Sequence, residues 1–292
     1  MSSILQRITP HIRDIGFPVR RLLPDAKARS VGPFVFLDHM GPTSFEAGTT
    51  AGDVRAHPHI GLATITYLFS GAIVHRDSLG SVQRIEPGDV NWMTSGRGIV
   101  HSERIPADIR DQATIVQGLQ MWVALPQEAE ECEPGFWHYP NADLPRIALD
   151  GVNVHVLVGT VAEQTSPVKA ASPTLYAALD MHGGSTFTVQ ADYAERAVYV
   201  VSGSIAVDDE LVESGTLIVL ESGVEVELVA QSDARLMLVG GAPLDGPRTL
   251  WWNFVTSSKE RLEVAKTAWA DQDPAQFPKV PGEVEFIPLP ER

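Results

Sequence analysis

Short β-rich runs, each followed by turn-forming residues, recur along the whole chain and constrain its fold more than any other feature. The first half contains ATITYLF, GAIVHRD and VQRIEPGDVNWM, and the second contains VNVHVLVG, RAVYVVSG and GTLIVLESG. Many short strands separated by Gly, Pro, Asn and Asp predict an all-β sandwich or barrel. A helical pattern is convincing only in TSSKERLEVAKTAWA, where Ser257 and Glu260 form a possible capping box. The proline-rich stretch after this helix is expected to be an extended tail.

An internal repeat divides the chain. The segment ITYLFSGAIVHRDSLGSVQRIEPGDVNWM resembles AVYVVSGSIAVDDELVESGTLIVL, and both have a strand, an S-G turn, a second strand and a Gly-containing turn into another strand. This duplication predicts two tandem β-barrels, one over residues 1–135 and one over residues 136–292. The second copy has no HxH ahead of its strand and no histidine after its Gly turn, so any metal site should belong to the first barrel.

Charge and composition exclude several functional classes. The net charge is −15, from 22 basic and 37 acidic residues, and such an acidic surface repels phosphate backbones, so we expect no direct nucleic-acid binding. No apolar run reaches the roughly 18 residues that cross a bilayer, so no membrane association is expected. The single cysteine, Cys132, excludes an intramolecular disulfide and fits a reducing compartment. Without a secretory h-region near the start, the expected location is cytoplasmic.

Two pairs of potential metal ligands stand in β-patterned sequence. His57 and His59 are separated by one residue, as are His101 and Glu103. Residues i and i+2 of a strand share one face, so each pair projects together. Pairing of the two strands would bring three imidazoles and one carboxylate to a single metal ion. Neutral imidazole is a good ligand for transition metals.

This ligand set limits the metal and its chemistry. Cysteine ligands are absent, so a closed structural zinc site is a poor fit. Mixed nitrogen and oxygen ligation with open positions suits one mononuclear Fe(II), Mn, Ni, Co or Cu(II) ion, and Zn stays possible. Water, an organic chelator or dioxygen can take the open positions. Glu103 can act both as a ligand and as the base that accepts a proton from a substrate hydroxyl.

Other histidines and aromatic residues have ordinary structural interpretations. His155 is expected to be a strand histidine rather than a ligand, and His75 is expected to close a hairpin, with a place at a pocket rim as the alternative. His39 is interpreted as structural, the alternative being that it orients a ligand. Trp122 is expected in the core, the alternative being the wall of an aromatic pocket.

Several stretches together resemble the pirin family of cupin proteins. They are FLDHMGP (36–42), HPHIGLATITYLFSG (57–71), HRDSLG (75–80), PGDVNWMTSGRGIVHSE (87–103), LQMWVALP (119–126) and WNFVTSS (252–258). The resemblance implies a bicupin with one metal in the N-terminal barrel, favours iron, and assigns the ligands His57, His59, His101 and Glu103.

The same resemblance implies two alternative functions. Some pirins resemble quercetinases, which bind a flavonol through the metal, add both atoms of O2 and release carbon monoxide. The first hypothesis is therefore an iron-dependent dioxygenase that acts on a small aromatic chelator. The second is a metal-dependent regulatory protein that binds a protein partner. A remnant fold without metal is disfavoured by the four intact ligand positions. Ile60 and Ala63 depart from the arginine and glutamate that pirins often carry, and the change can alter pocket polarity and substrate choice.

Overall fold

The computed structural model describes residues 2–291, which form two compact units. The first unit, here named the N-terminal barrel, comprises Ile12–Arg20, Leu37–Asn141 and residues 245–291. The second, named the C-terminal barrel, comprises residues 2–11, Arg21–Phe36 and Ala142–Leu244. In the middle of the chain, the N-terminal barrel ends at Asn141 and the C-terminal barrel continues from Ala142. The expected boundary was after residue 135. Residues 2–11 lie in the C-terminal barrel, and residues 245–291, with the helix and tail expected in the second barrel, lie in the N-terminal barrel.

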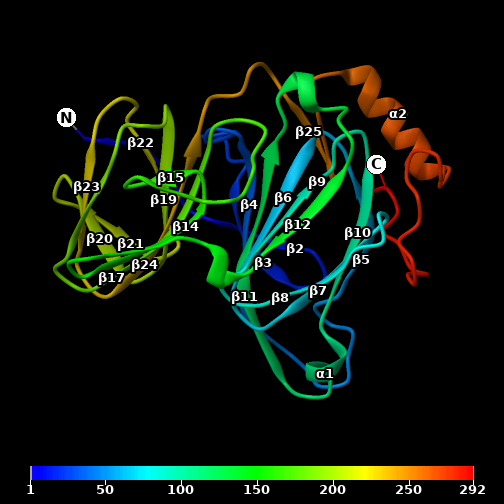
Figure 1. The fold of residues 1–292 in the computed structure, drawn as a ribbon, viewed down its shortest axis with the longest axis horizontal. Helices are drawn as coiled ribbons and strands as arrows, with labels where there is room; N and C mark the ends of the chain where they lie inside the picture. The colour runs from blue at the N-terminus through cyan, green and yellow to red at the C-terminus, as the bar shows by residue number, and fades with distance from the viewer. Residues whose placement is uncertain (1, 292) are drawn as a thin grey trace. The chain divides into compact units, whose positions relative to one another are not determined.

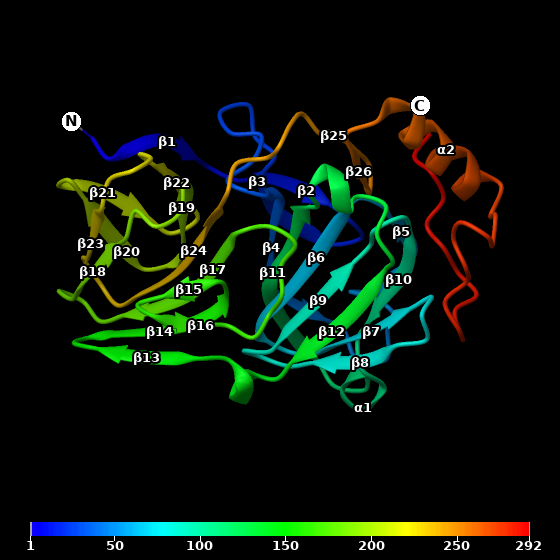
Figure 2. The same ribbon diagram turned by 45° about the horizontal axis from the view of Figure 1, so that its top comes forward.

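The N-terminal barrel is built from two antiparallel sheets (Figures 1 and 2). A seven-stranded sheet has the order β12-β9-β6-β11-β4-β3-β2, and a four-stranded sheet has the order β5-β10-β7-β8. The strands are β2 (His11–Asp14), β3 (Pro18–Leu23), β4 (Phe34–Phe45), β5 (Val54–His59), β6 (Leu62–Ser70), β7 (Ile73–Asp77), β8 (Val82–Ile85), β9 (Val90–Thr94), β10 (Ile99–Arg104), β11 (Thr114–Ala124) and β12 (Gly135–Tyr139).

The C-terminal barrel repeats this arrangement with the same numbers of strands. Its seven-stranded sheet has the order β1-β22-β19-β24-β17-β14-β13, and its four-stranded sheet has the order β18-β23-β20-β21. The strands are β1 (Ile4–Ile8), β13 (Arg146–Leu149), β14 (Val152–Val158), β17 (Thr174–Met181), β18 (Thr186–Val189), β19 (Glu195–Ser202), β20 (Ser204–Val207), β21 (Glu210–Glu213), β22 (Leu217–Leu220), β23 (Val226–Ala230) and β24 (Ala234–Gly241), with a separate hairpin of β15 (Thr160–Val161) and β16 (Gln164–Thr165). The all-β prediction and the duplication are both confirmed.

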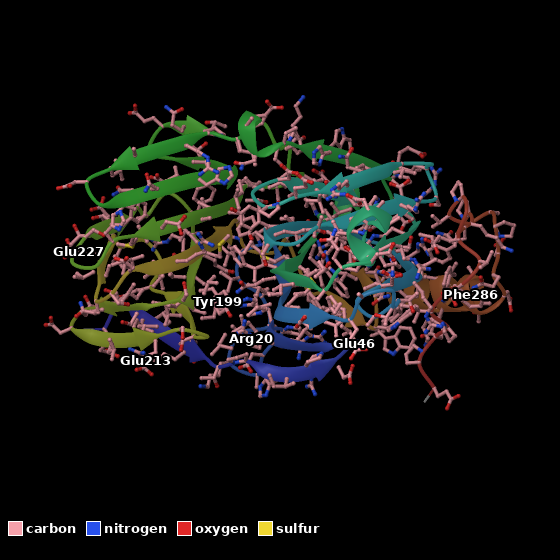
Figure 3. The ribbon with its side chains drawn as sticks, turned by 90° about the horizontal axis from the view of Figure 1, so that it is seen from below. Arg20, Glu46, Tyr199, Glu213, Glu227 and Phe286 are labelled. Atoms are coloured by element: carbon pink, nitrogen blue, oxygen red, sulfur yellow. The ribbon has the colours of Figure 1, made fainter. Side chains whose placement is uncertain are left out.

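Side-chain alternation in the C-terminal barrel follows the expected strand period. Tyr199 is buried in β19, whereas Glu213 and Glu227 are exposed on β21 and β23 (Figure 3). The barrel interior is a continuous apolar cluster that includes Phe187, Val189 and many aliphatic residues of both sheets. The inward residues therefore supply a hydrophobic core, and the outward ones supply the acidic surface that the composition predicted.

The end of the chain packs against the strands that carry the histidines. Helix α2 (Lys259–Ala270) follows the hairpin of β25 (Thr249–Trp251) and β26 (Phe254–Thr256), and the remaining helical turns are α1 (Ala107–Arg110), η1 (Gln127–Ala129) and η2 (Asn141–Asp143). Leu262, Ala265 and Trp269 of α2 pack with the fully buried Phe254. The tail beyond the helix is irregular, and Phe286 contacts Trp269 at a ring-centroid distance of 5.7 Å (Figure 3).

The start of α2 differs by one residue from the expected capping box. Ser258, not Ser257, is the N-cap, and its hydroxyl accepts the Arg261 N–H at 3.2 Å. Ser257 instead donates its backbone N–H to the buried carboxylate of Glu130 at 3.0 Å. Within residues 2–291, no helix is both long enough and apolar enough to cross a bilayer.

The buried His155 generates a prediction about acid stability. This residue lies in β14, and burial, together with the charge of its cross-strand partner Arg146, lowers its pKa to about 4. As the pH falls, the unfolded chain binds this proton near its ordinary pKa, before the folded chain does. The stabilisation that neutral His155 contributes is therefore fully present above about pH 6.5. We expect the free energy of unfolding to fall by about 1–2 kcal/mol by pH 5.

Denaturant unfolding of the metal-free protein at pH 7 and pH 5 measures this loss. The His155→Gln variant should lose less stability than wild type between the two pH values. His182→Gln is the matched control, because His182 is exposed in the same barrel. Equal pH dependence in wild type and His155→Gln would show that His155 does not contribute.

Candidate metal centre

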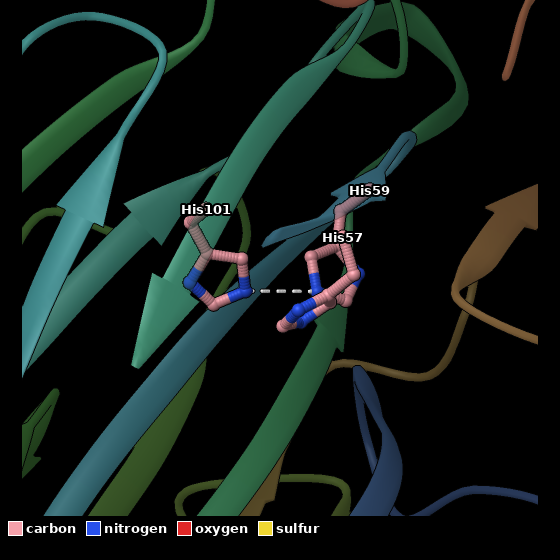
Figure 4. A group of neighbouring side chains, drawn as sticks. All are labelled: His57, His59 and His101. Atoms are coloured by element: carbon pink, nitrogen blue, oxygen red, sulfur yellow. Dashed lines mark hydrogen bonds between the residues drawn. The ribbon is translucent and has the colours of Figure 1, made fainter. Parts of the chain in front are cut away.

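The antiparallel pairing of β5 with β10 brings three predicted ligands together. In this register Ile99 is opposite His59 and His101 is opposite His57. The three imidazoles point toward one another from the two strands (Figure 4). One nitrogen of each ring lies within 4.8 Å of the corresponding nitrogens of the other two, and all three side chains are buried. The structure thus confirms that His57, His59 and His101 form one cluster.

Hydrogen bonds at the outer nitrogens determine which ring nitrogens face this cluster. His57 Nδ1 lies 2.8 Å from the carbonyl oxygen of Arg55, and His59 Nδ1 lies 2.9 Å from that of Asn253. A carbonyl oxygen only accepts hydrogen bonds, so each Nδ1 must carry the proton. Nε2 of both rings is then unprotonated and has a lone pair available for a metal ion.

The inner nitrogens of two of the rings are close together. His59 Nε2 lies 3.1 Å from His101 Nε2, the contact drawn in Figure 4. Burial lowers the pKa of His57 to about 4 and holds the pKa values of His59 and His101 well below 6.5, so all three rings are neutral at pH 7. Where both facing nitrogens lack a proton, their lone pairs repel, and a bound metal ion removes this repulsion. The donor set therefore fits a transition metal.

Glu103 occupies a different position from the three histidines. Its carboxylate is not part of the group of donors within 4.8 Å. A register shift between His101 and Glu103 places Glu103 opposite Val54 rather than opposite Arg55. Burial raises the pKa of Glu103 to about 7, partly offset by the hydroxyl of Thr66, which is 3.5 Å from its Oε1. That Glu103 binds the metal stays a prediction.

Sequence reasoning missed the environment of His75. It lies within β7 rather than in a turn, is buried, and contacts both His101 and Asp77. The signal was present in the sequence, because His75 and Asp77 have the same i, i+2 spacing as the two ligand pairs.

Three other residues are placed by the structure. The ring of Trp122 meets that of His59 edge-on at 5.2 Å, so Trp122 supports a member of the cluster. His39 lies beside the Arg20 guanidinium at 2.9 Å and is not in the cluster. Ile60 is buried with Phe254 and α2, on the opposite side of β5 from the imidazoles. Its departure from the family pattern therefore changes the packing behind the cluster.

The C-terminal barrel has apolar residues at the corresponding positions. Strands β18 and β23 pair as β5 and β10 do, with Val189 opposite Val226 where His59 is opposite Ile99. Phe187 and Leu228 form the next inward pair and take the places of His57 and His101. The metal-binding cluster thus belongs to the N-terminal barrel, as the repeat predicted.

Comparison with known proteins gives consistent results for both barrels. The family model of Pirin matches residues 16–123, and that of the Pirin C-terminal cupin domain matches residues 176–274. A pirin-like protein of Caulobacter vibrioides is 44% identical over 284 residues, or 96% of each chain. A Pseudomonas aeruginosa protein with the provisional name quercetin 2,3-dioxygenase is 39% identical, over 92% of this chain and 85% of its own. The crystal structure of a quercetin 2,3-dioxygenase from Acinetobacter baumannii has a TM-score of 0.90 at 35% identity, covering 99% of this chain and 96% of that one.

The cluster predicts about one bound transition-metal ion per chain. His59→Ala should reduce metal content to less than a tenth of wild type, because it removes one of three converging nitrogens. His182→Ala should keep the wild-type content, since this histidine is exposed in the C-terminal barrel. Elemental analysis after reconstitution and desalting measures the stoichiometry. Two equivalents per chain, or none, would contradict the assignment.

Proposed function

The chain belongs to the pirin family, and from that premise we propose that it is a metal-dependent dioxygenase of the quercetin 2,3-dioxygenase type. The proposed substrates are O2 and a flavonol or a similar small aromatic chelator. Both atoms of O2 enter the organic product, and the ring carbon between the two cleaved bonds leaves as carbon monoxide. The observation that carries the proposal is the buried cluster of His57, His59 and His101, supported by the relatives with quercetin dioxygenase names.

The three histidines would hold the metal, and we propose Fe(II) as the native ion. When bound, the metal supplies a coordination site for the chelating oxygens and exchanges electrons with O2. The protein contributes three neutral imidazoles, and His57 and His59 donate their Nδ1 protons to backbone carbonyl oxygens. Metal binding at neutral pH therefore displaces no proton from these rings, which supports a tightly bound ion.

Glu103 is proposed as the base that accepts the substrate hydroxyl proton. Burial raises the pKa of Glu103 to about 7 in the metal-free protein, and the carboxylate would take the proton when it is displaced from the metal. The Thr66 hydroxyl donates to Gln120 Oε1 at 2.9 Å and lies 3.5 Å from Glu103 Oε1. Thr66 would therefore limit the rotation of the carboxylate. Glu103 is also proposed as the fourth metal ligand, although its carboxylate lies outside the histidine group.

We expect Glu103→Gln to separate metal binding from turnover. The amide keeps an oxygen donor, so metal should be retained with about 10–100-fold weaker affinity. Turnover per bound metal should fall further, by about 10²–10⁴-fold, because the amide cannot accept the hydroxyl proton. Glu227→Gln is the control, since Glu227 is exposed on β23. The measurements are O2 uptake, carbon monoxide release and product mass, normalised to bound metal.

The dioxygenase proposal fails if metal-loaded wild-type protein consumes no O2 with a panel of flavonols and related chelators. A regulatory role, in which the metal centre controls binding to a protein partner, would then take precedence. A pull-down with metal-loaded and metal-stripped protein would test that role.

A further inference from the structure

A second buried polar group lies next to the histidine cluster, on strand β7. This strand pairs with β10 so that Asp77 is opposite His101 and His75 is opposite Glu103. His75 and Asp77 are 5% and 0% exposed. His75 is not part of the group whose donor atoms converge within 4.8 Å. It touches His101 on the nitrogen that faces away from His59, because the contact joins Nδ1 of both rings at 3.4 Å.

Asp77 is held as an ionised hydrogen-bond acceptor. Its Oδ1 accepts the backbone N–H groups of Leu79 and Ser81 at 2.9 and 3.0 Å, and its Oδ2 lies 3.0 Å from His75 Nε2. Burial raises the pKa of Asp77, but the hydrogen bonds from His75 and Ser81 outweigh it and leave the pKa below its ordinary value. An ionised carboxylate only accepts hydrogen bonds, so His75 must carry its proton on Nε2.

With its proton on Nε2, His75 favours one of the two tautomers of His101. A neutral imidazole with its proton on Nε2 has a lone pair on Nδ1. This lone pair can accept the Nδ1–H of His101 across the 3.4 Å contact. The ring of Phe136 stacks on His75 at 4.2 Å with an interplanar angle of 10°, which fixes the plane of the His75 ring. In the tautomer that donates to His75, His101 presents an unprotonated Nε2 to the cluster, as His57 and His59 do.

The C-terminal barrel shows that the fold itself does not need these polar residues. Its strands β20 and β23 correspond to β7 and β10, and Ile205 is opposite Ala230 where His75 is opposite Glu103. Val207 follows two residues later in the same strand. Ile205 and Val207 are fully buried in the apolar core of that barrel. The barrel that lacks the three imidazoles therefore also has no histidine or aspartate within the strand that pairs with β23 in this way.

We propose that Asp77 and His75 are positioning residues, which hold the proton of His101 on Nδ1 so that Nε2 is free to bind a transition metal. The proposal rests on the metal centre of the proposed function but does not require dioxygenase activity. Carboxylate or carbonyl groups commonly orient metal-binding histidines. Here the carboxylate acts through an intervening imidazole.

Asp77→Asn tests this proposal, because the substitution should move the protons of His75 and His101 to the opposite nitrogen of each ring. The Leu79 and Ser81 N–H groups still need an acceptor, so they hold the amide oxygen at the position of Oδ1. The amide NH2 then faces His75 and donates to Nε2, which moves the His75 proton to Nδ1. His75 now donates to His101, whose own proton moves to Nε2, the nitrogen that should bind metal. We expect about 10–100-fold weaker metal binding.

Two measurements, both without substrate, would test the proposal. Ni(II) affinity is determined by competition with a chromophoric chelator, and the imidazole ¹⁵N shifts of the metal-free protein report the tautomer of His101. Wild type should carry the His101 proton on Nδ1, and Asp77→Asn should carry it on Nε2 with weaker Ni(II) binding. Asp89→Asn is the matched control, because Asp89 also accepts two backbone N–H groups, from Glu86 and Asn141 at 2.9 and 2.8 Å. It should bind Ni(II) as wild type does.

The proposal is overturned if wild-type His101 carries its proton on Nε2, or if Asp77→Asn matches wild type in tautomer and Ni(II) affinity. Should Asp77→Asn fail to fold, the wild-type spectrum still decides the tautomer. The double variant His75→Ile/Asp77→Val, which replaces both polar side chains by the kind of apolar residue found in β20, then tests Ni(II) affinity, and wild-type affinity there would also overturn the proposal. Loss of Ni(II) binding by wild type would instead refute the metal centre itself.

Discussion

The pairing of β5 with β10 is the interaction on which the metal centre depends. It joins His59 and His101, which are 42 residues apart in the chain, across one inter-strand register. A slip of one residue would turn one pair of imidazoles to the opposite face of the sheet. Packing behind the sheet opposes such a slip, because Ile60 and Val100 alternate with the histidines and are buried with Phe254 and α2. The C-terminal segment thus stabilises the register that creates the site.

Burial of the imidazoles has an electrostatic cost that the neighbouring hydrogen bonds only partly offset. The outer nitrogens of His57 and His59 are satisfied by backbone carbonyl oxygens, whereas the inner nitrogens of His59 and His101 face each other at 3.1 Å. A buried polar group without a suitable partner is destabilising. Metal binding removes this cost, so ligand affinity and local stability are coupled at the cluster. The site is arranged in advance, since few groups need to move or lose protons.

The sequence predicted those features that depend on local spacing. The HxH and HxE pairs identified His57, His59 and His101 because the strand period places alternate residues on one face. The position of Glu103 could not be predicted as well, because the register shift after His101 depends on how β5 and β10 pair. The incorporation of β1 in the C-terminal sheet was equally hidden, since its partner β22 lies about 200 residues away. The spacing of His75 and Asp77 predicts that they share a face, but the contact of His75 with His101 depends on how β7 pairs with β10.

The two barrels have the same strand arrangement, and only one of them has the histidine cluster. Both have a seven-stranded and a four-stranded sheet with equivalent strand orders, and they differ in chemistry on the inner face of the smaller sheet. There the apolar residues of one barrel form a core that needs no ligand, while the polar residues of the other are stable only when each proton has a defined acceptor. The corresponding pairs are His57 and Phe187, His59 and Val189, and His101 and Leu228. A functional centre in this fold is therefore a set of coordinated substitutions on one sheet face, because a single imidazole placed in the apolar barrel would have neither a metal nor an acceptor for its proton.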